Sequence, residues 1–517
     1  MTDPLSSRAN QYLYMGAIVA LIAIGATIRA WGVLINPLDL WADEAWWAEL
    51  LETRGLTELG IRPVGYMWIN RQLLAWGDPA VMLRLISLAA GIGALYFQYR
   101  SAELLLKSRI AVLFVLLLAA FHPNLIVFAK EFKPFSLEVF VFSALTWGSL
   151  AALRKGRPGT GFWGAAVVSL PFSYPVVFLY PALALAFFGE RLARLRRFAW
   201  PRLVIGALIV VPLLFLLHML AYDWLDAARS RHFWGNKYGL FPLERGWLGG
   251  FAWYGEKSWN LLARPGALDA MPPFALHLFA LAAIGGVASL WAAMRLRELA
   301  LLLVPVLTVA LANLLGYWPY GPFRANLFLI PGTLLLIGLA VDWVALRPYL
   351  RSAAYAAAAG ALLAVLAHDP ASYRRKSMAN WAPSPQLTEV LDAIEDRRDS
   401  SANAGANVII ADWHSWRPIA FYLRQYPALR DSVRLVRGPL ADLQRLADLV
   451  AMEAERAALE PRATRLWIVA TRLNPHRAIR EDVVVQRHAV YRREFALHDR
   501  NYHPMLIELR LPGAREQ

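Results

Sequence analysis

Residues 161–188, GFWGAAVVSLPFSYPVVFLYPALALAFF, decide how this chain is threaded through a membrane. Basic clusters flank the run on both sides, RKGR at 154–157 and RLARLRR at 191–197. Such clusters between apolar runs are typical of cytoplasmic loops, so the chain must cross an even number of times between them. The middle of the run, LPFSYPVV, is rich in helix breakers. We therefore predict two short helices with a tight turn near Ser173, at least one of them shielded inside the bundle.

The composition agrees with many membrane spans. Of the 517 residues, 58% are hydrophobic and 18% are charged, whereas soluble domains carry about 25% charged residues. Adding nine other apolar runs to the two short helices predicts a mainly α fold, a polytopic membrane helix bundle of about 11 spans. The N-terminus is predicted to lie inside. The nine runs are 12–34, 80–99, 110–128, 135–153, 202–221, 273–293, 299–316, 325–344 and 353–367.

Charge and cysteine content exclude several classes of protein. The net charge is +15, but no basic face is interleaved with exposed aromatic residues, so we predict no nucleic-acid partner. The chain contains no cysteine, which excludes a disulfide scaffold and thiolate chemistry. The first run, 12–34, is longer than a signal-peptide core of about 7–15 residues, and no small-residue cleavage site follows it. We expect it to be a retained span.

The predicted topology places almost every unusual polar or aromatic segment on the outer side of the membrane. A first outer loop spans 35–79, and an aromatic-rich loop spans 222–272. For that second loop, sugar binding and interfacial anchoring are equally good interpretations. The segment after about residue 368 also lies outside.

The C-terminal part of the chain changes character. Short β-like segments alternate with amphipathic ones, which predicts a small α/β domain. We therefore predict two domains, 1–367 in the membrane and 368–517 outside it. The predicted strands are 407–413, 432–438 and 465–471, and the predicted helices are 415–426 and 440–458.

The first outer loop opens with WADEAWWAELL, residues 41–51, in which Asp43 and Glu44 are adjacent. The spacing predicts a helix lying in the membrane interface, with tryptophans at the level of the lipid headgroups. A structural interpretation makes Asp43 the N-cap of this helix, and a functional one makes the carboxylates part of a reaction centre. The predicted apolar face consists of Trp46, Trp47, Leu50 and Leu51.

A second helix, predicted over 62–77, completes the loop. It would bring Arg62, Tyr66, Asn70 and Arg71 to the same outer surface. Arg84 follows near the outer end of the second span. A charge within a span usually has a partner; an acidic residue of the loop and a snorkelling side chain are both possible explanations.

Two further outer turns carry basic residues. Lys130, Glu131 and Lys133 lie in a short turn after the third span, and Arg324 follows the Pro/Gly-rich turn GYWPYGPF. Arginine and lysine at this boundary suit a phosphate group. Solvated charges and an interfacial anchor are the structural alternatives.

Other polar residues have simpler interpretations. His232 and His277 are expected to be structural, since the sequence has no metal-ligand spacing of histidines and carboxylates. Trp413, His414 and Trp416 could contact a sugar, but Asp412–Ser415 more simply supplies a helix N-cap after a strand.

The order of these segments resembles the C-type (GT-C) membrane glycosyltransferases that use polyprenyl-phosphate sugars. The likeness is to the branch of protein O-mannosyltransferases and the lipid A aminoarabinose transferase. It rests on the loop opening with Asp-Glu, the KEFKPFSLE turn, the YWPYGPFR segment and the outer C-terminal domain. It covers about residues 10–345, most strongly 10–155.

The resemblance implies roles for particular residues. Asp43 would be the general base, with Glu44 beside it. Glu131 matches the family's second-turn pattern, but Lys133 replaces an arginine and Phe135 a tyrosine, which loses a guanidinium fork and a hydroxyl. Arg324 matches a late arginine that meets the lipid phosphate. Lys130, Arg62 and Tyr66 are further candidates for substrate contacts, and neither a metal nor another cofactor is expected.

The function implied is an inverting transfer of a sugar from a polyprenyl phosphate to a hydroxyl of a glycan, lipid or protein. The expected location is the bacterial inner membrane, with the C-terminal domain in the periplasm and membrane lipids as surroundings. A transporter or flippase of lipid-linked sugars and a non-catalytic anchor for the C-terminal domain are the alternatives. Few charges at mid-depth of the spans argue against a transporter.

Overall fold

The computed structural model describes residues 8–35, 37–55, 62–194, 239–264, 273–322, 324–366, 387–397, 407–411, 413–437, 465–470, 489–494 and 505–510. The chain forms two compact units. Unit 1 contains Met1–Trp31, Gly55–Leu73 and Arg84–Tyr373, and unit 2 contains Gly32–Arg54, Leu74–Leu83 and Arg374–Gln517. The predicted domain boundary at 367/368 lies outside the described residues.

Unit 1 is a helix bundle. Its α-helices are α1 (Arg8–Ala30), α3 (Val64–Leu74), α5 (Leu85–Leu105), α6 (Arg109–Phe121), α7 (Pro123–Phe128), α8 (Phe135–Arg154), α9 (Thr160–Val168), α10 (Tyr180–Arg194), α13 (Gly246–Ala263), α14 (Pro273–Ala292), α15 (Leu296–Leu314), α16 (Ile330–Ala345) and α17 (Arg351–Leu366). Short 3₁₀ helices include η2 (Tyr174–Phe178), η3 (Leu243–Arg245) and η5 (Arg324–Leu329).

The chain is a multi-pass membrane protein with a mainly helical fold. Six helical segments in the described part are long and apolar enough to cross a bilayer, and two shorter apolar helices accompany them. The predicted span 202–221 lies outside the described residues. The six segments are Asn10–Ala30, Pro79–Leu105, Phe135–Arg154, Phe274–Ala292, Leu296–Leu314 and Arg324–Ala345.

The break predicted near Ser173 is confirmed. Helix α9 ends at Val168, a turn follows, and η2 leads into α10. Ser173 itself is extended and fully buried. The predicted span 110–128 is also interrupted, because α6 ends at Phe121 and α7 begins again at Pro123, which lacks the N–H that a continuous helix requires.

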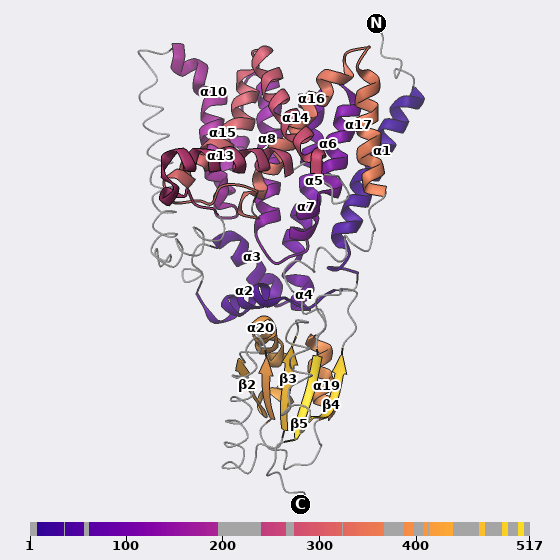
Figure 1. Cartoon of the computed structure of the whole chain (residues 1–517), viewed down its shortest axis with the longest axis vertical. Helices are drawn as coiled ribbons and strands as arrows, with labels where there is room; N and C mark the ends of the chain where they lie inside the picture. The colour runs from indigo at the N-terminus through magenta and orange to yellow at the C-terminus, as the bar shows by residue number, and fades with distance from the viewer. Residues whose placement is uncertain are drawn as a thin grey trace, which may run out of the picture. The chain divides into compact units, whose positions relative to one another are not determined.

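The centre of the bundle is apolar and closely packed. Helices α5, α6, α8, α14 and α16 lie side by side (Figure 1) and supply much of its buried core. A Cβ atom on Gly286 of α14 would lie 2.0 Å from the Leu336 carbonyl oxygen of α16. Small residues at such crossings let membrane helices approach closely, where packing rather than a hydrophobic force drives association.

Unit 2 contains the outer-loop helices α2 (Ala42–Thr53) and α4 (Pro79–Met82) together with a small α/β fold. The α/β fold includes α19 (Leu387–Arg397), α20 (Trp413–Tyr422), η6 (Leu423–Gln425) and α21 (Pro427–Arg430). Its strands are β1 (Asn407–Ala411), β2 (Val433–Arg437), β3 (Arg465–Ala470), β4 (Ala489–Glu494) and β5 (Met505–Arg510).

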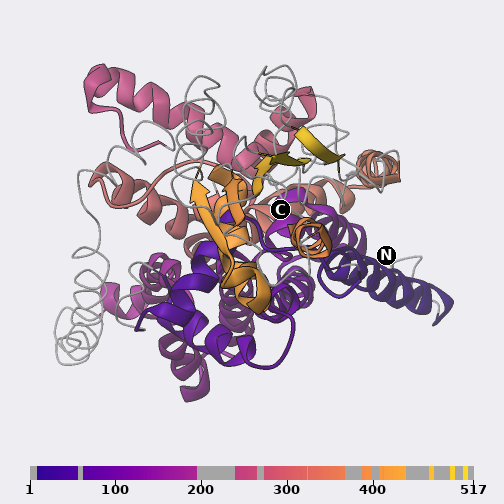
Figure 2. The same ribbon diagram turned by 90° about the horizontal axis from the view of Figure 1, so that it is seen from below.

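The five strands form one mixed sheet in the order β2-β1-β3-β5-β4. Strand β1 is parallel to β2 and β3, whereas β5 is antiparallel to β3 and β4. Figure 2 shows these strands, coloured orange to yellow, from below. The predicted strands β1, β2 and β3 and the helix α20 are confirmed, β4 and β5 were not predicted, and the predicted helix 440–458 lies outside the described residues.

Candidate functional site

The charged turn after α7 is buried. Lys130, Glu131 and Lys133 are 7%, 6% and 4% exposed, and we call residues 130–133 the basic turn. The turn is tight, since the Lys133 N–H donates to the Glu131 carbonyl at 2.7 Å and the Lys130 N–H to Val127 at 3.0 Å. The short turn therefore keeps its charges close together within unit 1.

A tyrosine from the outer loop braces this turn. The Ser87 hydroxyl donates to the Lys133 carbonyl at 2.9 Å, and Tyr66 Oη lies 3.1 Å from Ser87 Oγ. Because the serine proton is used by Lys133, Tyr66 is the donor in this chain. The Tyr66 ring also stacks on Phe132 with centroids 5.8 Å apart. Tyr66 and Ser87 are both fully buried, so helices α3 and α5 hold the turn from two sides.

The break in the 161–188 run positions α3. The Gly65 N–H donates to the Pro171 carbonyl at 2.8 Å, and Tyr174 Oη donates to the Arg62 carbonyl at 3.1 Å. A Cβ on Gly65 would lie 2.8 Å from the Phe172 ring, so only glycine permits this approach without a shift. The stretch that decides the topology thus also places Tyr66 beside the basic turn.

Arg324 joins the same region. Its guanidinium carbon lies 5.9 Å from the centre of the Phe135 ring, the first residue of α8, two positions beyond Lys133. The preceding turn is held by Asn326, which donates to the carbonyls of Pro319 at 2.9 Å and Gly321 at 2.8 Å. Trp318 Nε1 donates to Asn326 Oδ1 at 2.9 Å. This network fixes the backbone of the turn from which the half-buried Arg324 side chain extends.

Unit 1 therefore brings together Tyr66, Lys130, Glu131, Lys133 and Arg324. Arg62, four residues before Tyr66, is half-buried, and Arg84, at the start of α5, is 4% exposed. Buried charges are expensive unless they are paired or meet a ligand. With more cations than carboxylates, the region is chemically suited to an anion such as a phosphate monoester.

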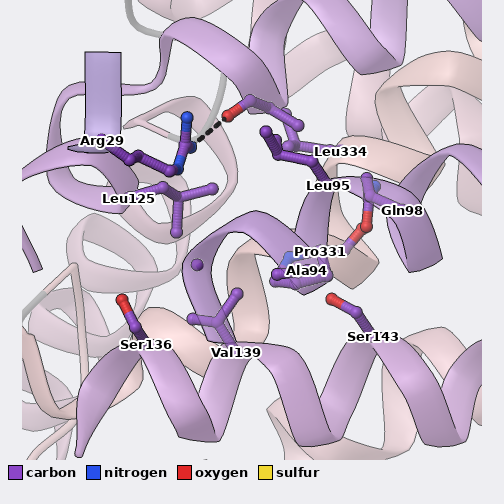
Figure 3. Close-up of a pocket in the computed structure, with 12 residues that line it drawn as sticks. Arg29, Ala94, Leu95, Gln98, Leu125, Ser136, Val139, Ser143, Pro331 and Leu334 are labelled. Atoms are coloured by element: carbon purple, nitrogen blue, oxygen red, sulfur yellow. Dashed lines mark hydrogen bonds between the residues drawn. The ribbon is translucent and has the colours of Figure 1, made fainter. Parts of the chain in front are cut away.

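Sequence reasoning missed Arg29, which is fully buried near the end of α1. Its guanidinium donates to the carbonyls of Gly25 at 2.9 Å, Ala120 at 2.9 Å and Ala119 at 3.0 Å. The last carbonyls of a helix lack helical partners, and those of α6 find them here (Figure 3). A cavity of about 10 Å³, enough for about one water molecule, adjoins this arginine and is lined in part by Gln98, Ser136 and Ser143.

Glu138 was also missed. It lies in the first turn of α8 and is 5% exposed. The rule that was applied to Arg84, that a charge inside a span calls for an explanation, would have identified both Arg29 and Glu138. Both lie at the ends of their helices, so they do not form a midplane site of the kind that transporters use.

In unit 2, the structural interpretation of Asp43 as the N-cap of its helix is wrong. Helix α2 begins at Ala42, and Trp41 is the N-cap. Glu44, at the third helical position, accepts a hydrogen bond from the Trp41 N–H at 3.2 Å and is fully buried. This is half of a capping box, so the capping function falls to Glu44, while Asp43 is half-buried at the second helical position.

The predicted apolar face of α2 is wrong in part, since Leu51 is buried and Trp47 and Leu50 are half-buried, but Trp46 is not. Trp46 is 36% exposed, whereas the buried stripe follows an i, i+3 spacing of small residues. Small side chains let the helix backbone approach its neighbours closely, which bulky tryptophans would prevent. The stripe is Ala42, Ala45, Ala48 and Leu51.

The remaining predicted residues divide between structural ones and undescribed ones. His277 Nδ1 accepts a hydrogen bond from Trp259 Nε1 at 2.9 Å, a structural use of the ring. Asn70 is buried and its side chain donates to the Tyr66 carbonyl at 2.8 Å. This hydrogen bond lies within α3, which contains both residues. His232 and Asp412 lie outside the described residues, as does much of the loop 222–272. Within the described ranges, no group of three or more histidine and carboxylate side chains could hold a metal ion.

Comparison with known proteins gives structural likeness alone. No known family description matches the chain, and no curated protein sequence matches it. Among solved structures, ArnT from Cupriavidus metallidurans bound to undecaprenyl phosphate is similar over 97% of this chain and 99% of its own, with 14% identity and a TM-score of 0.47. The apo state of the same protein is similar at 13% identity and a TM-score of 0.45, with the same coverage.

The oligosaccharyltransferase of Archaeoglobus fulgidus in its apo form is similar over 89% of this chain and 70% of its own, with 14% identity and a TM-score of 0.46. ArnT is a lipid A aminoarabinose transferase, and both enzymes are of the GT-C type that the sequence motifs resemble. At this identity and TM-score, the likeness assigns no activity, donor or acceptor to the chain.

Proposed function

We propose that this protein is a membrane glycosyltransferase that moves a sugar from a polyprenyl-phosphate donor to a hydroxyl acceptor, with inversion at C1. The observation that supports the proposal most is the burial of the basic turn next to Tyr66 and Arg324 in a membrane protein. Buried cations of this kind are suited to bind a ligand that carries a phosphate. The reaction needs such a phosphate as its leaving group.

The proposed roles follow from the chemistry of the step. The acceptor oxygen forms a bond to C1 while the bond from C1 to the phosphate oxygen breaks, and the bonding pair leaves with the phosphate. Asp43 takes the proton of the acceptor hydroxyl. Lys133, Lys130 and Arg324 stabilise the charge that develops on the polyprenyl phosphate. Tyr66 and Ser87 hold the basic turn in place.

The proposal includes a location and a class of partners. We propose that the protein lies in a bacterial inner membrane with the C-terminal domain in the periplasm. The donor is a hexose or pentose on polyprenyl phosphate, and the acceptor is a glycan, a lipid or a protein. The buried carboxylate Glu44 is proposed as a structural cap, which leaves Asp43 as the base.

The test is an isosteric substitution. Asp43→Asn should lower the rate of transfer by at least about 100-fold, since a positioned base contributes about 10²- to 10⁴-fold, with the melting temperature little changed. The assay is mass spectrometry of lipid and glycan extracts from a deletion strain that expresses each variant at equal membrane level. If Glu44→Gln, which can keep the capping hydrogen bond, removes the product and Asp43→Asn does not, the assignment of the base is wrong. If no product differs between the deletion and wild-type strains, the proposed function itself fails.

A second test concerns distance. The mechanism requires Asp43 to lie within about the length of a sugar phosphate from Arg324, because a base must come within hydrogen-bond reach of its proton. The chain has no cysteine, so Asp43→Cys with Arg324→Cys leaves one possible pair. A short bismaleimide should link the pair within one chain in native membranes, and Asp43→Cys with Arg297→Cys, whose arginine lies in the first turn of α15, is the control expected not to link. Absence of a link in the first pair would contradict the mechanism.

A further inference from the structure

The start of the first outer loop is bound to the C-terminal domain within unit 2. The Asp39 carboxylate accepts from the Thr388 N–H at 2.8 Å and lies 3.0 Å from its hydroxyl. The Leu40 N–H donates to Tyr422 Oη at 2.8 Å. Leu40 and Tyr422 are both buried. The segment just before α2 is thus held by α19 and α20, although 349 and 382 residues separate the bonded pairs in sequence.

The helix itself is held by two arginines. The Arg417 guanidinium carbon of α20 lies 4.4 Å from the centre of the Trp46 ring. Arg424, in the following 3₁₀ turn, forms an ion pair with Glu52 and lies 4.0 Å from Glu49. A cation over a tryptophan contributes about 0.5–2 kcal/mol according to its exposure, so this contact adds to the hydrogen bonds of the Asp39 carboxylate and the Leu40 N–H at the start of the loop.

Asp43 belongs to the same stripe of α2. Residues three apart share a helix face, and Asp43, Trp46, Glu49 and Glu52 follow that spacing. Burial lowers the pKa of Arg417, while the negative charges of Glu49 and Asp43 raise it and Arg437 lowers it. The charges of Asp43 and Glu49 therefore act on Arg417 directly. We call Asp43, Trp46, Glu49 and Glu52 the acidic stripe of α2, and it faces α20 within unit 2.

A helix of this length needs such support. Helix α2 has 12 residues, and isolated helices shorter than about 12–15 residues are marginal in water. A catalytic side chain must be held to within about 0.5 Å of its working position. The contacts with α20 and the turn that follows it are therefore expected to help fix the helix and its second residue, Asp43.

We propose that the C-terminal domain is a positioning element for the transfer reaction, and that Arg417 is a positioning residue that orients α2 and with it Asp43. This inference rests on the proposed function for its catalytic part. It gives the C-terminal domain a role in the reaction of this chain other than binding a separate partner. Arg417 does not touch substrate; it acts through Trp46 and the acidic stripe.

Activity tests Arg417. Arg417→Met should lower the rate of transfer by about 10- to 100-fold, the range expected for a displacement of up to about 1 Å. Arg417→Lys keeps the charge but loses the planar stacking, so it should restore part of the rate. Arg430→Ala is the matched control, since Arg430 is exposed in the same domain and pairs with its neighbour Asp431. A full rate in Arg417→Met would overturn the positioning role.

Exchanging the charges of Arg424 and Glu52 tests the contact between α2 and the turn after α20 without any assay of activity. In Arg424→Glu, amide hydrogen exchange over residues 42–53 of the detergent-solubilised full chain should rise at least tenfold, because three carboxylates then repel one another. Adding Glu52→Arg should restore the protection. Equal exchange in the wild type and Arg424→Glu, or no rescue by the exchanged pair, would overturn the inference.

The two proposals fail in distinguishable ways. If the exchange data behave as expected but Asp43→Asn remains active, α20 supports α2 and Asp43 is not the base, so the proposed function fails in its mechanism. If Asp43→Asn is inactive but α2 exchanges freely in every variant, the base is correct and the positioning role of the C-terminal domain is wrong.

Discussion

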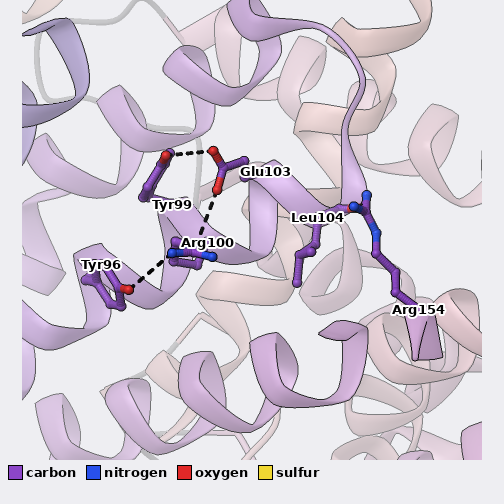
Figure 4. A network of polar contacts seen from close by, with 6 residues as sticks. All are labelled: Tyr96, Tyr99, Arg100, Glu103, Leu104 and Arg154. Atoms are coloured by element: carbon purple, nitrogen blue, oxygen red, sulfur yellow. Dashed lines mark hydrogen bonds and ion pairs between the residues drawn. The ribbon is translucent and has the colours of Figure 1, made fainter. Parts of the chain in front are cut away.

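The two ends of helix α8 treat charge in opposite ways. At its start, the basic turn buries Lys130, Glu131 and Lys133. At its finish, Arg154 is exposed and donates to the Leu104 carbonyl of α5, and Arg100 pairs with Glu103 one turn earlier on α5 (Figure 4). The side chains of that pair are 38% and 41% exposed. We call these the turn end and the far end of the bundle.

The difference lies in how far each set of charges is removed from water. Exposed ion pairs contribute little to stability and require little desolvation. The far end also holds a buried carboxylate, Asp342, but it accepts hydrogen bonds from the backbone N–H groups of Lys107 and Ser108. Charges at the turn end are removed from water, which is expensive unless something specific compensates. Arg29 shows one form of compensation, three backbone carbonyls of the bundle itself. The basic turn is proposed to bind a phosphate ligand, because it carries two lysines and one carboxylate.

The largest effect is expected at the basic turn. Lys133→Gln should lower the rate of transfer by about 10²- to 10³-fold, as removal of a single stabilising donor does in other enzymes. Lys133→Arg should recover much of the loss because it keeps the charge. The product defined by the deletion strain is measured at equal membrane level. Retention of full activity in Lys133→Gln would remove the turn from the mechanism and make its burial purely structural.

An intermediate effect is expected at Arg29, on stability instead of activity. Arg29→Met keeps much of the side chain's length but leaves the Ala119 and Ala120 carbonyls without their donor. Each unsatisfied buried group costs about 1–3 kcal/mol, so the variant should unfold at clearly lower temperature or SDS fraction. Transfer per folded molecule should stay near the wild-type rate. Loss of transfer with unchanged stability would place Arg29 with the functional charges.

The smallest effect is expected at the far end. Arg100→Ala breaks an exposed pair at i, i+3 and should change the free energy of unfolding by no more than about 0.5 kcal/mol. The same SDS titration that is used for Arg29→Met measures it. A change as large as that of Arg29→Met would show that the two ends of the bundle do not differ as described.

Prediction from sequence succeeded where the decisive residues are neighbours in the chain. The break near Ser173 depends on closely spaced helix breakers, and the basic turn depends on a span that ends and another that begins within a few residues. Both follow from local chemistry and span length. Prediction failed for α2, because the residue that begins a helix depends on what the rest of the helix packs against. Trp41 is the N-cap of α2, and the buried carboxylate that accepts from its N–H is Glu44 and not Asp43.

By itself, the sequence determined that this is a polytopic helical membrane protein with a small C-terminal α/β fold, and that a short charged turn follows the third apolar run. Those conclusions need only hydropathy, helix breakers and the spacing of charged residues. The tertiary structure alone decided which charges are buried, which residue caps α2, and that α20 holds the loop that carries Asp43. These depend on contacts between segments hundreds of residues apart, whose energies are set by packing and desolvation rather than by any local pattern.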